Sequence, residues 1–303
     1  MKEPEKYLIT VVGPTAIGKT SLAIKLAKHY HTEILSCDSR QFFKEMYIGT
    51  AVPSEKELNE AQHHFIQHIS IFDSYSVGDF ERDAILKLSS LFKDNNVVVM
   101  AGGSGLYVNA VIKGLDEFPE VPEHIRTELN KLYENQGIEA LQVRLKELDP
   151  VHYEKMDIQN PQRVIRALEI CIASNKPYSS FLNQKKVIRP FKSIVVGLTA
   201  NREVIYDRIN KRVDIMIENG LIEEAKRLFT YRKLNALQTV GYKELFKYFE
   251  GEYTKEFAIS EVKKNTRRFA KRQLTWFNRN ENTLWFDFNI PLKEIIEKIE
   301  MEK

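Results

Sequence analysis

The chain has 303 residues, of which 43% are hydrophobic and 29% charged, with a formal net charge of +3. These values are ordinary for a globular protein, and the length excludes a small disulfide-stapled fold and suggests one large domain or a domain with an insertion. Cys37 and Cys171 lie far apart without metal-type spacing, which favours a reducing compartment. The N-terminus does not resemble a signal peptide, and no window approaches the ~20 apolar residues of a membrane span. We therefore expect a cytoplasmic protein without a membrane segment.

Apolar runs separated by helical stretches predict a parallel sheet. Residues 7–12 form a continuous apolar, β-branched run that is typical of a buried parallel strand, and a helix is predicted over 20–30. Further strands are predicted at 33–37, 97–101, 193–198 and 283–288. Strands spaced in this way are joined by right-handed crossovers, so the expected fold class is α/β, with a parallel sheet flanked by helices.

The strand pattern stops between about 112 and 190. Five prolines punctuate helical segments in this region: Pro119, Pro122, Pro150, Pro161 and Pro177. We predict a helical insertion over 112–190, between two parts of one α/β core formed by 1–111 and 191–303. Residues 201–278 are again helical and rich in charge.

Residues 13–20, GPTAIGKT, match the phosphate-loop pattern G-x-x-x-x-G-K-[ST] between a predicted strand and a predicted helix. In such a loop, backbone N–H groups point at anionic oxygens and the following helix adds its positive N-terminal end. Lys19 supplies a charge for terminal phosphate oxygens, and the Thr20 hydroxyl can ligate Mg²⁺. The loop specifies a polyphosphate but no nucleotide, because a diphosphate ester satisfies the same groups.

Asp38 and Ser104 follow two other predicted strands. Ligand sites in a doubly wound sheet form beyond the carboxyl ends of the strands, so both side chains are expected beside the phosphate loop. A carboxylate there can help to hold Mg²⁺ or accept a proton from a nucleophile. The structural alternatives are a helix cap or turn at Asp38 and a plain turn at Ser104.

Residues 261–279 predict a helix that is basic on one side and apolar on the other. Its basic rows are Lys263, Arg267, Lys271 and Lys264, Arg268, Arg272; its apolar side is Val262, Phe269, Ala270, Leu274, Trp276 and Phe277. A solvated face normally mixes signs, whereas no acidic residue follows Glu261 here, so we expect nucleic-acid phosphates to face these rows. A membrane surface is the less favoured alternative, because the core needs the apolar side.

Together these segments resemble the tRNA dimethylallyltransferases, also called tRNA isopentenyltransferases, along almost the whole chain. The resemblance rests on an ordered set: GPTAIGKTSLAIKLA, CDSRQFFKEMYIGTAVPS (37–54), HHFI and YSVGDF (within 63–80), AGGSGLYVNAVIKGLD (101–116), NPQRVIRALEI (160–170), TVGYKEL (239–245) and TRRFAKRQLTWF (266–277). Ser104 stands where threonine is more usual in the family.

The resemblance implies transfer of a dimethylallyl group from dimethylallyl diphosphate to N6 of adenosine 37 in tRNA, next to an adenosine at position 36. It implies a kinase-like P-loop core, an insertion that contacts the anticodon stem-loop, Mg²⁺ as cofactor and no obligate protein partner. The target base has to leave the anticodon stack, and single-stranded loops are where proteins read RNA.

The resemblance also assigns roles to residues. The diphosphate and Mg²⁺ fall to Gly13, Pro14, Thr15, Ala16, Ile17, Gly18, Lys19 and Thr20, with Thr20 as metal ligand. Asp38 matches the proposed general base, and Ser104 matches a hydroxyl near the reacting amine. The positions expected to contact tRNA are Asp38, Ser39, Arg40, Gln41, Ser104, Arg126, Gln159, Asn160, Pro161, Gln162, Arg163, Lys264, Arg267, Arg268, Lys271 and Arg272. Some members carry an arginine just before VGY that faces the diphosphate; because Gln238 and Thr239 stand here, another basic side chain is expected to serve.

Three other functions fit part of the pattern. A small-molecule or nucleotide kinase would share the fold, but it does not explain the basic helix. A prenyltransferase acting on free adenine nucleotides would need less RNA-binding surface. A P-loop RNA-binding switch would show nucleotide-dependent RNA affinity without a covalent product.

Overall fold

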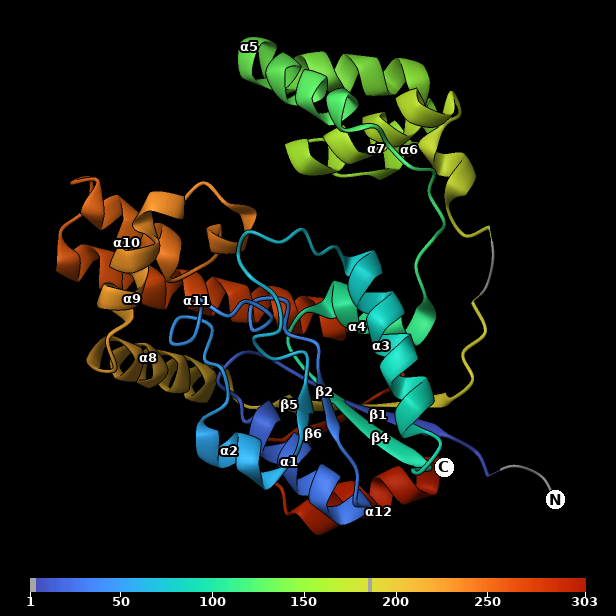
Figure 1. Cartoon of the computed structure of the whole chain (residues 1–303), viewed down its shortest axis with the longest axis vertical. Coiled ribbons are helices and arrows are strands. Elements are labelled where there is room, and N and C mark those ends of the chain that lie inside the picture. Colours follow the sequence, from blue (N-terminus) through green and yellow to red (C-terminus); the bar gives the residue numbers. More distant parts are fainter. Residues whose placement is uncertain (1–3, 185–186) are drawn as a thin grey trace. The chain divides into compact units, whose positions relative to one another are not determined.

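The computed structural model describes residues 4–184 and 187–303, which form two compact units (Figure 1). The core unit runs to Ile112 and resumes at Arg189, and the insertion unit comprises Lys113–Ile188. Each unit has its own cluster of buried apolar side chains.

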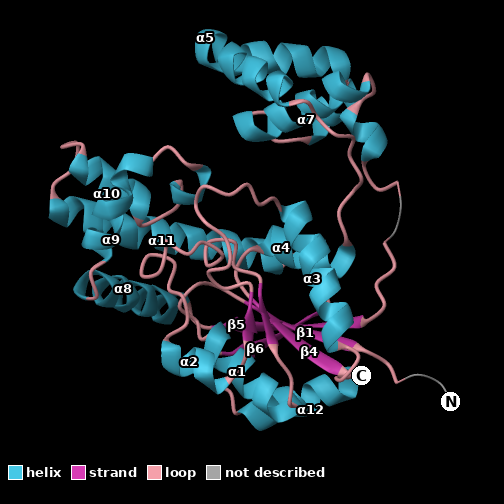
Figure 2. Cartoon of the chain, viewed as in Figure 1, coloured by secondary structure: helices cyan, strands magenta, loops and turns pink. Residues whose placement is uncertain are grey.

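A parallel sheet lies at the centre of the core unit, as Figure 2 shows. The described residues form six strands in the order β3-β2-β4-β1-β5-β6. The strands are β1 (Tyr7–Val12), β2 (Ile34–Ser36), β3 (His63–His64), β4 (Val97–Ala101), β5 (Lys192–Thr199) and β6 (Thr283–Asp287). The predicted α/β class is confirmed, and the structure adds the edge strand β3, which is too short for any periodicity to indicate.

Alternate residues of β1 face opposite sides of the sheet, and this alternation builds the core. Ile9 and Val11 pack with α1 (Lys19–Tyr30), α8 (Arg202–Glu218) and α12 (Leu292–Glu302), whereas Leu8 and Val12 pack with α3 (Val77–Leu91) and α4 (Gly105–Lys113). A third apolar cluster joins α9 (Leu221–Leu228), α10 (Tyr242–Phe249) and Met46. The remaining core helices are α2 (Glu55–Glu60) and α11 (Lys255–Phe277).

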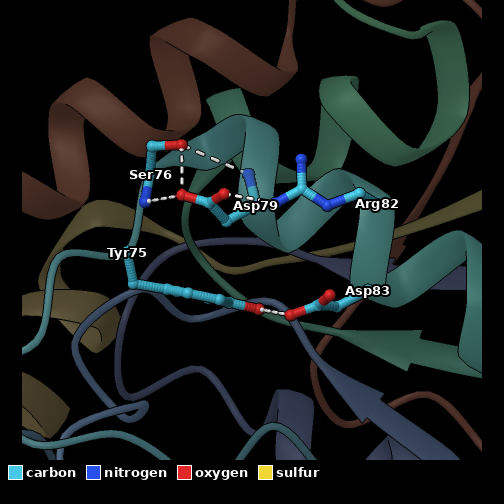
Figure 3. A network of polar contacts seen from close by, with 5 residues as sticks. All are labelled: Tyr75, Ser76, Asp79, Arg82 and Asp83. Atoms are coloured by element: carbon cyan, nitrogen blue, oxygen red, sulfur yellow. Dashed lines mark hydrogen bonds and ion pairs between the residues drawn. The ribbon is translucent and has the colours of Figure 1, made fainter.

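The YSVGDF segment begins α3, and its polar side chains explain why the helix starts there (Figure 3). Ser76 Oγ accepts a hydrogen bond from the Asp79 N–H at 3.2 Å, and the Asp79 carboxylate accepts one from the Ser76 N–H at 2.8 Å. This reciprocal capping box satisfies two N–H groups that a helix end leaves unpaired. Arg82 pairs with Asp79, and the Tyr75 hydroxyl donates to Asp83 at 2.9 Å.

The insertion unit consists of helices in its described residues: α5 (Glu123–Leu148), which is interrupted at Gly137, α6 (Pro150–Lys155), α7 (Pro161–Ser174) and the short 3₁₀ turn Tyr178–Phe181. Its apolar cluster joins α5 and α7 through Ile125, Leu129 and Leu168. The buried carboxylate of Glu169 receives Arg126 at 3.0 Å and Arg166 at 3.2 Å, so the charge of Glu169 is paired inside this unit.

The chain leaves the core after α4 and re-enters it at Arg189. The Arg189 guanidinium donates to the Ala110 carbonyl at 2.6 Å and pairs with Glu81 of α3. Arg189 therefore attaches the returning chain to the last turn of α4, the helix after which the chain leaves the core.

Candidate active site

The carboxyl ends of β1, β2 and β4 bring the sequence-predicted residues to one edge of the sheet. The phosphate loop follows β1, Asp38 follows β2, and Gly103 and Ser104 follow β4. The parallel register fixes this meeting point, because Val11 and Ser36 both align with Ala101. The site therefore lies where doubly wound sheets bind their ligands.

The phosphate loop is built around two glycines. Gly13 has φ 142°, and a Cβ at this position would lie 2.5 Å from the Leu198 carbonyl oxygen, so a side chain is excluded. Gly18 caps α1 in a left-handed conformation without a side chain to accept from the first turn. The N–H groups of that first turn are thus left for an anion.

Lys19 bends back over the loop that precedes it. Its Nζ donates to the carbonyl oxygens of Gly13 at 3.1 Å and Pro14 at 2.8 Å. Burial lowers the pKa of Lys19 to about 8, although the Asp38 carboxylate opposes this shift. The ammonium group is therefore held at the loop and carries its charge at neutral pH.

The eight loop residues are not equivalent. Pro14 has no N–H group, the Ile17 side chain is buried in the core, and the Thr15 N–H donates to Gln273 Oε1 at 2.9 Å. Because Gln273 Nε2 also donates to the Gly103 carbonyl at 2.9 Å, this buried side chain of α11 joins the phosphate loop to the loop after β4.

A cavity of about 440 Å³, here called the loop cavity, opens beside the phosphate loop. Four basic side chains line it: Lys19, Arg208, Lys211 and Arg212. Arg208 Nε donates to the Ala16 carbonyl at 2.8 Å, which fixes α8 against the loop. This concentration of positive charge suits a polyphosphate.

A second cavity of about 570 Å³, here called the aromatic cavity, is lined by Tyr107, Phe269 and Trp276 together with polar groups. Ser39, Arg40 and Ser104 are among those polar groups. Its mixture of aromatic faces and hydrogen-bonding groups suits a planar heterocycle.

The two cavities adjoin, because Thr15, Asp38, Thr50 and Arg212 line both of them. A group bound in the aromatic cavity would lie next to a polyphosphate bound in the loop cavity, with the Asp38 carboxylate at the boundary between them. This arrangement can remove a proton from one ligand while the other loses an anionic leaving group.

Arg212 is one of the site residues that motif reading did not single out. It lies one helical turn after Arg208 on α8, and no hydrogen bond among the described residues engages its guanidinium. Burial lowers the pKa of Arg212, whereas Asp38 and Glu57 raise it. The signal in the sequence was the i,i+4 spacing of Arg208 and Arg212 within a helical, charge-rich segment.

The side chains near Asp38 divide between the two cavities. Ser104 Oγ accepts from the Ser39 N–H at 3.0 Å and lines the aromatic cavity. Arg40 donates to the carbonyls of Asn235 and Ala236 at 3.0 and 2.9 Å. Gln41 lines the loop cavity alone. Arg40 and Gln41 thus make protein contacts that shape the site.

The basic helix differs from its prediction in two respects. Lys263 pairs with Asp214 of α8 at 2.6 Å and Lys264 pairs with Glu261 at 2.8 Å, so carboxylates face two positions at which the sequence predicts nucleic-acid phosphates. Phe269 was expected in the core, yet 37% of it is exposed and it lines the aromatic cavity. The pattern of polar and apolar residues within α11 carries no information that α8 packs beside it.

Of the six residues in the two basic rows of α11, Arg268, Lys271 and Arg272 are exposed. Arg272 lies over the Phe269 ring at 5.7 Å from its centroid, at the aromatic cavity. Arg267 is only partly exposed and donates to Asn210 at 2.7 Å. The exposed row is therefore the part of the helix that is available to an external polyanion.

The residues of the insertion that are predicted to contact tRNA make contacts at or near the first turn of α7. Asn160 Oδ1 accepts from the Arg163 N–H at 3.3 Å, and Pro161 occupies the first turn. Arg126 donates to Gln162 at 3.1 Å, and Arg163 lies 3.9 Å from Asp157. Together with Gln159, whose N–H donates to Asp157, they form a polar surface on the insertion unit.

Among residues 4–184 and 187–303, no group of three or more His, Cys, Asp or Glu side chains is arranged to hold a metal ion. A metal at this site would depend on Thr20, which lines the loop cavity together with Asp38, and on oxygens of the bound ligand. None of the described helices is both long and apolar enough to cross a membrane.

Comparison with known proteins places the chain in one family. A model of the IPP transferase family matches residues 41–280. A tRNA dimethylallyltransferase of Flavobacterium johnsoniae is 61% identical over 300 residues, covering 97% of each chain, and one of Christiangramia forsetii is 63% identical over 294 residues with the same coverage. The crystal structure of the full-length tRNA isopentenylpyrophosphate transferase of Bacillus halodurans is 38% identical, covers 98% of this chain and 95% of its own, and superposes with a TM-score of 0.71. The chain belongs to the IPP transferase family, with the tRNA dimethylallyltransferases among its relatives.

Proposed function

We propose that this protein transfers a dimethylallyl group from dimethylallyl diphosphate to N6 of adenosine 37 of tRNA, releasing diphosphate. The observation that carries the proposal is the pair of adjoining cavities that share Asp38 and Arg212. One cavity suits a diphosphate and the other a flipped base, and relatives with this name are more than 60% identical.

The donor diphosphate binds in the loop cavity. The first-turn N–H groups of α1 and the cations of Lys19 and Arg212 surround its oxygens. The Thr20 hydroxyl would hold Mg²⁺ together with oxygens of the ligand, and the ion would supply further positive charge to the leaving group. As the C1–O bond of the donor breaks, these groups stabilise the charge that develops on the diphosphate.

The acceptor adenine enters the aromatic cavity, where Phe269 and Trp276 offer faces on which bases stack. Its N6 forms a bond to C1 of the dimethylallyl group, and the N6 proton passes to the Asp38 carboxylate and then to solvent. Neutral N6 is a poor nucleophile, so removing this proton as the bond forms lowers the barrier. The exposed row Arg268, Lys271 and Arg272 binds phosphates of the stem.

Incubation with labelled dimethylallyl diphosphate, Mg²⁺ and unmodified tRNA with adenosines at positions 36 and 37 tests the proposal. We expect label on adenosine 37, located by nuclease digestion and mass spectrometry. Absence of label on this nucleoside would overturn the proposal. Phosphoryl transfer from ATP to a small acceptor without RNA would favour a kinase instead.

A further inference from the structure

A buried carboxylate outside both cavities holds a backbone segment that forms part of the wall of the aromatic cavity. Glu224 of α9 is 2% exposed, yet it accepts four hydrogen bonds. Its Oε2 accepts from the N–H groups of Tyr47 at 3.1 Å and Ile48 at 2.8 Å, and its Oε1 accepts from the Gly49 N–H at 2.9 Å and the Tyr242 hydroxyl at 2.7 Å. Four donors saturate a carboxylate, which makes its burial tolerable.

The backbone that Glu224 holds continues directly into the site. Gly49, Thr50 and Ala51 line the aromatic cavity, and Thr50 also lines the loop cavity. Gln41, three residues after Asp38, donates its Nε2 to the carbonyls of Thr50 at 3.3 Å and Ala51 at 2.9 Å. The segment 47–51 is therefore fixed at one end by Glu224 and at the other by the loop that carries Asp38.

The fourth donor links Glu224 to a second segment of the wall of the aromatic cavity. Tyr242 is fully buried at the start of α10, directly after Val240 and Gly241, which line the aromatic cavity. A Cβ on Gly49 would lie 2.6 Å from the Tyr242 ring, so the two segments touch at a position where only glycine fits. One carboxylate thus fixes the spacing between the two segments.

We infer that Glu224 is a positioning residue for the acceptor: it sets the width of the aromatic cavity by holding Gly49–Ala51 against the segment 240–242. The inference rests on the proposed function for the identity of the acceptor. Glu224 lines neither cavity, and the phosphate loop is held by other contacts, so its effect falls on tRNA and spares diphosphate binding.

The test uses Glu224→Gln and Tyr242→Phe in the full chain, with Glu223→Gln, on the exposed side of the same helix, as control. In Glu224→Gln the amide nitrogen faces N–H or O–H donors, so we expect kcat/KM for tRNA to fall about tenfold or more. The affinity for inorganic diphosphate, measured by calorimetry, should stay within about twofold. Tyr242→Phe removes a single donor, so its loss should be smaller and in the same direction.

Equal losses for tRNA and diphosphate, or no loss for tRNA, would overturn the inference; if Glu224→Gln does not fold, Tyr242→Phe is judged by the same criterion. Amide hydrogen exchange separates this inference from the proposed function, since it needs no turnover. Residues 47–51 should exchange faster in Glu224→Gln while residues 13–20 keep their wild-type rates. Unchanged exchange at 47–51 contradicts the positioning role even if the wild-type protein prenylates tRNA.

Discussion

The side chain of Gln273 accepts a hydrogen bond from the Thr15 N–H at 2.9 Å, so the basic helix is bonded directly to the phosphate loop. Gln273→Leu removes this bond and the one to the Gly103 carbonyl, leaving a buried carbonyl and a part-buried N–H group without these partners. We expect the free energy of unfolding to fall by about 1–3 kcal/mol in denaturant titration. Thr275→Ala, exposed on the same helix, should change it by less than about 0.5 kcal/mol; equal effects in the two variants would contradict this role.

Replacing Asp38 with asparagine keeps the shape of the side chain and removes its ability to take a proton. We expect kcat for tRNA prenylation to fall by about 10²–10⁴-fold. The dissociation constant for tRNA, measured by fluorescence anisotropy, should change little, because the amide can still accept from N6. A variant with normal turnover would exclude Asp38 as the general base.

The lowered pKa of Lys19 predicts how diphosphate binding depends on pH. Below about pH 8 the Lys19 ammonium is charged. Above this pH Lys19 of the free protein is deprotonated, and binding of the anion requires Lys19 to take up a proton. Affinity for diphosphate should therefore fall as pH rises from about 8, by up to about tenfold per pH unit. In Lys19→Arg the side chain stays charged, so the part of the slope due to Lys19 should disappear; identical slopes in calorimetry would refute the assignment.

Arg212 contacts both cavities, whereas Lys211 contacts the loop cavity alone and pairs with Asp207 at 2.8 Å. Arg212→Gln should lower kcat by about 10²–10³-fold, because a charge facing the leaving group is lost. Lys211→Gln is the matched control and should cost much less. Steady-state kinetics with dimethylallyl diphosphate as the varied substrate distinguishes the two; similar losses would show that Arg212 acts only through general charge.

The exposed row of α11 predicts a defined salt dependence. Replacing Arg268, Lys271 and Arg272 with glutamine should weaken tRNA binding and reduce the slope of log affinity against log salt by about 0.7–0.9 for each phosphate that is no longer neutralised. Lys293→Gln with Lys298→Gln on α12 is the control, since both lysines pair with glutamates at 3.7 Å. An unchanged slope in the triple variant would mean that this row is only a solvated surface.

All the described strands except β3, the phosphate loop and the position of Asp38 could be predicted because their signals are local. A six-residue apolar run, a loop of fixed spacing and a polar residue after a strand are each contained in a short window. The carboxyl ends of parallel strands then place them together without further information.

The remaining features depend on contacts between distant segments. Asp214 pairs with Lys263, and Glu224 bonds to residues 47–49 from 175 to 177 positions away. Phe269 follows the apolar period of its helix, yet it faces a cavity because no described segment covers that part of α11. A helical wheel shows which side of a helix is apolar but leaves open what packs against it.

The bond between Arg189 and the Ala110 carbonyl has an evolutionary consequence. Departure and return of the chain are joined at 2.6 Å, and β4 and β5 each pair with β1 independently of the segment between them. Residues 113–188 can therefore change in length, or be replaced, without altering the order or the pairing of the strands in the core sheet.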